Sequence, residues 1–68
     1  MTDSDLKALQ NFLNRTGGLD SHSNKDLMDD AIYAGANSYR CEQALKTLAY
    51  NLRREGKEDL AEHVEYYL

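Results

Sequence analysis

Residues 39–61 read YRCEQALKTLAYNLRREGKEDLA, and they carry the clearest helical pattern in the chain. The apolar side chains of the first part recur every three or four residues: Cys41, Ala44, Leu45, Leu48 and Leu52. That spacing places them on one side of an α-helix. We expect this helix to span residues 39–55, after a cap at Asn37 or Ser38. It should stop at Gly56, because glycine readily adopts the left-handed conformation that ends a helix.

A second helix follows at once, from about Lys57 to the last residues of the chain. Its inward side is expected to hold Leu60, Ala61, Val64, Tyr67 and Leu68. The connection at Gly56 is very short, so the two helices must fold back on each other. The pattern therefore predicts an antiparallel hairpin at the C-terminal end.

Two more helices are expected before residue 39. The first spans about Ser4 to Arg15, after a cap among residues 2–4, and a loop covers residues 17–24. The second helix begins after a cap at Ser23 or Asn24, where Ser23 and Asp26 resemble a capping box, and it ends near residues 35–37. One valine, one isoleucine and three threonines leave almost no material for a β-sheet. We predict a single all-α domain over residues 1–68, a compact bundle of about four short helices.

The chain is short and mildly acidic, with 68 residues, a formal net charge of -4, no proline, no tryptophan and one cysteine. One cysteine cannot form an internal disulfide, and a domain this small buries only about 60% of the surface that its unfolded chain exposes. Stability must then come from regular helix packing or from self-association, so we expect a homodimer. Because there is no long apolar run and no signal-peptide pattern, we expect a cytoplasmic protein without membrane contact.

No motif in the chain indicates an enzyme. The sequence lacks a glycine-rich phosphate loop, an HExxH zinc motif, a CxxC pair and a GxSxG elbow. His22, expected in a polar loop, lies far from His63 in the sequence. Cys41 falls on the apolar side of its helix, where a free cysteine is usually an inert core residue. We therefore predict no catalytic, cofactor-binding or metal-binding residues.

The side of the 39–55 helix that lies opposite its leucines combines basic and aromatic residues. The candidate partner-binding residues are Tyr39, Arg40, Gln43, Lys46, Tyr50, Arg53 and Arg54. Tyrosine and arginine are enriched at the energetic centres of protein interfaces, although an ordinary solvated face also carries long basic side chains. We interpret the chain as a small protein–protein interaction module, a regulator or inhibitor of the kind that phages and mobile elements encode.

Self-association would use the charges of the last two helices. The last helix is expected to expose Glu58, Glu62 and Glu65, which could meet the basic face of a second copy in a two-fold dimer. Four tyrosines fall outside the apolar stripes and add amphipathic surface: Tyr33, Tyr39, Tyr50 and Tyr66.

The alternative function is a DNA-binding transcriptional regulator. Ala31, Gly35, Ala36 and Cys41 resemble the small, turn and apolar positions of a helix-turn-helix motif. The third helix would then present these residues to a groove: Asn37, Ser38, Tyr39, Arg40, Gln43 and Lys46. Asp30 at a normally apolar position and the negative net charge argue against this alternative. A further interpretation is that the acidic faces of the second and last helices mimic phosphates.

Overall fold

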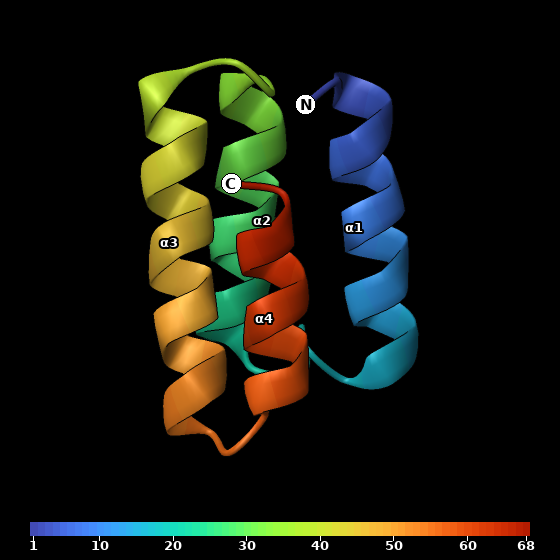
Figure 1. Ribbon diagram of the computed structural model, residues 1–68, viewed down its shortest axis with the longest axis vertical. Coiled ribbons are helices and arrows are strands. Elements are labelled where there is room, and N and C mark those ends of the chain that lie inside the picture. The colour runs from blue at the N-terminus through green and yellow to red at the C-terminus, as the bar shows by residue number, and fades with distance from the viewer.

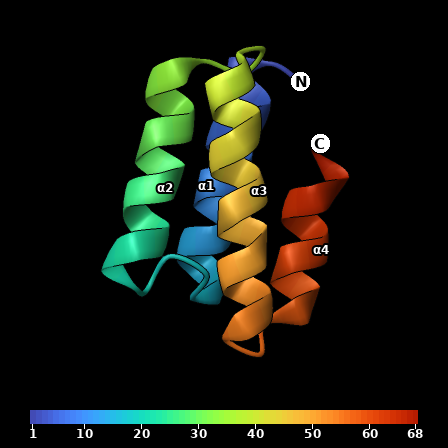
Figure 2. The same ribbon diagram turned by 90° about the vertical axis from the view of Figure 1, so that its left-hand side faces the viewer.

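A computed structural model describes all 68 residues and contains four helices and no strands. The helices are α1 (Asp3–Thr16), α2 (His22–Ala34), α3 (Tyr39–Arg54) and α4 (Glu58–Tyr66). Successive helices run in opposite directions along the long axis of the molecule (Figure 1). The predicted all-α bundle is therefore confirmed, and α3 and α4 form the expected antiparallel hairpin (Figure 2).

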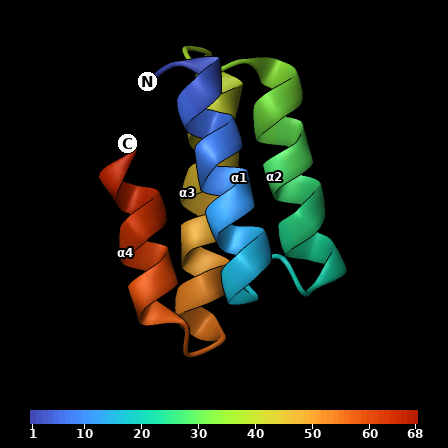
Figure 3. The ribbon, with the colours of Figure 1, turned by 90° about the vertical axis from the view of Figure 1, so that its right-hand side faces the viewer.

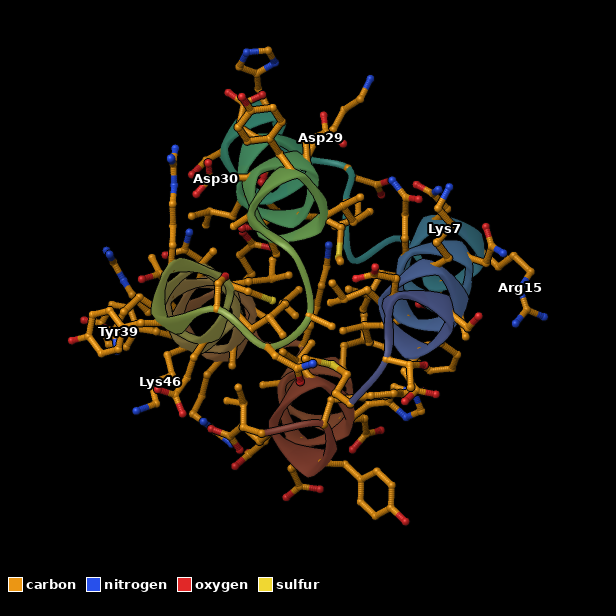
Figure 4. All side chains as sticks on the ribbon, turned by 90° about the horizontal axis from the view of Figure 1, so that it is seen from above. Lys7, Arg15, Asp29, Asp30, Tyr39 and Lys46 are labelled. Atoms are coloured by element: carbon orange, nitrogen blue, oxygen red, sulfur yellow. The ribbon has the colours of Figure 1, made fainter.

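The four helices stand at the corners of a square. Viewed from above, α1 lies opposite α3, and α2 lies opposite α4 (Figure 4). Close backbone approaches occur only between neighbouring corners, and Figure 3 shows α1 in front of α3 with α2 and α4 on either side. Each helix consequently turns one side to a shared core and the opposite side to solvent.

The core is built mainly from leucines. Its largest fully buried apolar side chains are Leu6, Leu9, Leu13, Met28, Leu45, Leu48, Leu52 and Val64. Each buried leucine stabilises the fold by about 1.5–3 kcal/mol relative to an exposed one. Small buried residues such as Ala44, Ala49 and Ala61 occur on α3 and α4, and they allow neighbouring helices to approach closely. Accordingly, α3 packs closely on α2 and α4, whereas α1 approaches its neighbours at few places.

Side chains cap the first three helices. Thr2 forms a complete capping box on α1: its hydroxyl accepts from the Asp5 amide at 3.2 Å, and its own amide donates to the Asp5 carboxylate at 2.9 Å. The Ser38 hydroxyl accepts from the Cys41 amide at 3.0 Å and starts α3. Gly56 ends the α3 side of the hairpin with a φ of 81°, a conformation that favours glycine.

Two details of the predicted helices are wrong. The cap of α2 is Ser21, whose hydroxyl accepts from the Asn24 amide at 3.2 Å, so the expected capping box of Ser23 and Asp26 does not form. His22 therefore lies in the first turn of α2 and not in a loop. At the other end, α4 stops at Tyr66, and Leu68 is 46% exposed instead of facing the core.

The early start of α2 places Asn24 in the first turn of the helix. There its side chain is completely buried, at the end of the bundle that holds the α3–α4 turn. Its amide group donates to the Gly18 carbonyl at 3.1 Å and to the Glu55 carboxylate at 3.0 Å. Its carbonyl oxygen accepts from Asn51 at 3.2 Å. Every polar atom of Asn24 thus has a partner, and the α1–α2 loop is tied to the end of α3.

Candidate protein-binding face on α3

All seven predicted partner-binding residues lie on α3, and none of them is buried in the core. Tyr39 is 75% exposed and Tyr50 is 60% exposed, while the opposite side of the helix is formed by six buried residues. Figure 4 shows Tyr39 and Lys46 pointing away from the bundle. These side chains therefore lie on the solvent side of a helix whose opposite side is packed against the core.

The guanidinium of Arg40 is already paired with a carboxylate of the same chain. It donates two hydrogen bonds to the Asp30 carboxylate of α2, at 2.6 and 3.2 Å. The side chain of Asp30 is 34% exposed and lies on the side of α2 toward α3 (Figure 4). This pairing accounts for an acidic residue at a position that is usually apolar in a helix-turn-helix motif.

The guanidinium of Arg53 is likewise paired with carboxylates of α4. It donates to the two Glu65 carboxylate oxygens at 2.8 and 2.9 Å, and Glu58 lies 3.7 Å from its Nε. The hydrogen bonds raise the pKa of Arg53 and hold the pKa of Glu65 below its ordinary value. Two of the acidic side chains expected to meet a second copy are thus engaged by the chain's own arginine.

The residues left without an ion pair form one line along α3. We call this line the outer stripe, and it consists of Tyr39, Gln43, Lys46, Tyr50 and Arg54. The guanidinium carbon of Arg54 lies 5.7 Å from the centroid of the Tyr50 ring, within the range of a cation–π contact. The N-terminal end of the stripe adjoins a hollow of about 400 Å³ whose lining includes Tyr39, Glu42 and Tyr67.

The arrangement of α2 and α3 differs from a helix-turn-helix motif. The two helices run side by side in opposite directions along their lengths (Figures 1 and 2). In a helix-turn-helix motif the helices cross at about 90–120°. In addition, Arg40, a main candidate for base contacts, is paired with Asp30. Neither feature favours the DNA-binding alternative.

The two histidines and the cysteine interact with other side chains of the chain. The ring of His63 stacks on Phe12 of α1 at a centroid distance of 3.9 Å, and the exposed His22 lies 3.3 Å from Asp26 one turn further along α2. Burial raises the pKa of the Cys41 thiol, and the nearby Asp3 carboxylate adds to this effect. No three His, Cys, Asp or Glu side chains gather closely enough to hold a metal ion.

The sequence pattern correctly predicts that the candidate residues on α3 lie outside the core, but it does not show which of their charges are paired within the chain. Asp30 and Glu65 look like ordinary surface acids in the sequence, and only the packing of α2 and α4 brings them to Arg40 and Arg53. A weak signal existed for α4, because a short hairpin turn places Arg53 beside the helix that carries Glu58 and Glu65.

Comparison with known proteins adds no functional information. No family model matches the chain, and no curated protein or solved structure is significantly similar to it. None of the four helices is long and apolar enough to cross a membrane.

Proposed function

We propose that this protein is a small protein-binding module of the regulator or inhibitor type, which holds its partner on the outer stripe of α3. The proposal is a binding function and includes no catalytic step. The observation that carries it is the exposure of Tyr39 and Tyr50 on a helix whose other side is fully packed. We place the module in the cytoplasm, where a single unpaired cysteine such as Cys41 is stable as a thiol.

The side chains of the outer stripe are of types that contribute strongly to binding energy. Tyrosine offers a large amphipathic surface and arginine a planar group with several donors, and both are enriched among residues that dominate binding energy. Because α3 is already a formed helix packed on the core, its backbone is ordered before a partner docks, and little ordering entropy should be lost on binding. The four residues that can contribute most are Tyr39, Lys46, Tyr50 and Arg54.

A second copy of the chain is one candidate partner, since a domain this small gains stability from association. The expected contact between the basic face of α3 and the acidic face of α4 has fewer charges available, because Arg53 already binds Glu65 and Glu58 within one chain. Light scattering at micromolar concentration separates a mass of 7.8 kDa from twice that value. A dimer that persists in a Tyr50→Ala variant would show that self-association uses another face.

The proposed function is tested by affinity capture from extracts of the cells that produce the protein. Wild-type protein is compared with a Tyr50→Ala, Arg54→Ala double variant and with Tyr33→Ala, whose tyrosine on α2 is 85% exposed. We expect the double variant to lose the captured partner by at least about 30-fold, the effect of removing an interface hot spot, while Tyr33→Ala retains it. Equal capture by the double variant would contradict a role for the outer stripe.

A further inference from the structure

The formal charges divide sharply among the helices. Four basic residues and one acidic residue give α3 a charge of +3, whereas α2 has one lysine and three aspartates and α4 has four acids and no base. In α1 two acids balance two bases. Since α2 and α4 are the corner neighbours of α3, the one positive helix stands between two negative ones (Figure 4).

The outer stripe itself contains no acid. Lys46 and Arg54 form no ion pair, so the stripe carries two free positive charges. The single acid of α3, Glu42, is half-buried and lies outside the stripe. The two neighbouring helices carry exposed acids, Asp26 on α2 and Asp59 and Glu62 on α4. Asp30 lies on the side of α2 toward α3, where it pairs with Arg40, whereas Asp29 points away from α3 (Figure 4).

This distribution limits the width of an acidic partner. Packed helices lie about 8–10 Å apart, so the positive surface is one helix wide, and at 1.5 Å per residue it is about 22 Å long. A DNA duplex, with a major groove about 12 Å wide, would bring phosphates over the aspartates of α2 and the acids of α4. A single helix or strand avoids that repulsion.

The spacing of the stripe is compatible with a helical partner. Tyr39, Gln43, Lys46 and Tyr50 follow one another at intervals of four, three and four residues, the interval pattern along which two helices pack. Lys46 lies between the two tyrosines in this series. We infer that the partner docks a single acidic helix on the outer stripe, with a glutamate or aspartate against Lys46 and apolar side chains against Tyr39 and Tyr50.

This inference rests on the proposed function and specifies the chemistry of the same face. It is tested by following the backbone amide resonances of the ¹⁵N-labelled full chain at low salt. The probes are a helical peptide of about 20 residues with leucine and glutamate along one side, the same peptide with lysine for glutamate, and an oligothymidylate. We expect the glutamate peptide to shift amides of α3, with an affinity that falls as salt is added.

Charge reversal makes the test specific. In a Lys46→Glu, Arg54→Glu variant, we expect at least a tenfold loss of affinity for the glutamate peptide and a gain for the lysine peptide. The matched control is Lys7→Glu, Arg15→Glu, which makes the same change of net charge on the opposite helix α1 (Figure 4). This control should bind the glutamate peptide as the wild type does.

Three results would overturn the inference. These are a glutamate peptide that causes no shift on α3, an α1 reversal that weakens binding as much as the α3 reversal, and an oligothymidylate that occupies the stripe in place of the peptide. If the capture experiment finds a partner on α3 but the peptide does not bind, the proposed binding function is kept and the inference of an acidic helical partner is rejected. If both fail, the proposed function falls as well.

Discussion

α1 and α3 lie at opposite corners of the bundle, and both turn basic side chains to solvent between the same two acidic neighbours (Figure 4). On α1 these are Lys7 and Arg15, and no exposed aromatic side chain accompanies them. The one aromatic residue of α1, Phe12, stacks on His63 within the bundle. Both helices thus carry free positive charge, and the exposed tyrosines are what distinguishes α3 from α1.

The largest effect is expected where the two helices are alike, at their buried leucines. Leu48→Ala on α3 should cost about 2–5 kcal/mol of unfolding free energy, because the side chain is completely buried and leaves a cavity. Leu9→Ala on α1 should fall in the same range. Since a domain of this size has only about 3–5 kcal/mol in total, either substitution should remove a large part of its stability, which urea titration followed by circular dichroism measures. A loss below about 1 kcal/mol in urea titration would contradict the packing of that helix.

The next largest effect concerns the polar bridge between the loop after α1 and the end of α3. Asn24→Ala removes a buried amide and leaves the Gly18 carbonyl and Glu55 without this donor, which should cost about 1–3 kcal/mol. Urea denaturation measures the change. Asn14→Ala on the exposed side of α1 is the control and should leave the midpoint nearly unchanged. Equal effects of the two substitutions would remove the special role of Asn24.

The caps of the two helices allow a closer comparison. Ser38→Ala and Thr2→Ala should each cost about 1 kcal/mol, the usual value for an N-cap. We expect the larger loss at Ser38, because its part-buried hydroxyl also donates to the Gly35 carbonyl at 2.9 Å, whereas the Thr2 cap is exposed. Thermal denaturation of both variants gives the order, and a larger loss at Thr2 would reverse our ranking.

A smaller effect is expected from the ion pair of Arg53 and Glu65. Because the folded protein lowers the pKa of Glu65, the ionised pair stabilises the fold above the unfolded-state pKa of about 4.3 and stops doing so as pH falls through the folded value. The stability difference between wild type and Glu65→Gln should therefore be constant near neutral pH and shrink in acid. Urea midpoints measured across this range test the sign, and a difference that grows in acid would contradict it.

The smallest effect is expected at the outer stripe itself. Tyr50→Ala should change the free energy of unfolding by no more than about 0.5 kcal/mol, as should Lys7→Ala on α1, because neither side chain is buried. Urea denaturation of both variants checks this. A clear destabilisation by Tyr50→Ala alone would mean that the tyrosine supports the fold and is not free for a partner.

Local patterns were sufficient for much of the molecule. The leucine spacing of residues 41–52, the stop at Gly56 and the shortage of β-branched residues determined an all-α chain ending in a hairpin, because helical periodicity and glycine stops act over a few residues. The same periodicity placed Tyr39 and Tyr50 on the outward side of α3. Cys41 was correctly assigned to the core for the same reason.

Only the tertiary structure decided the start of α2 and the free charges on α3. Ser21 rather than Ser23 caps α2 in the fold that buries Asn24 between Gly18, Asn51 and Glu55, and no local pattern contains those long-range partners. Arg40 and Arg53 likewise look as free as Lys46 and Arg54 in the sequence. Packing brings Asp30 and Glu65 from neighbouring helices to the first two, and ion pairs between helices depend on distances in space that the order of residues does not state.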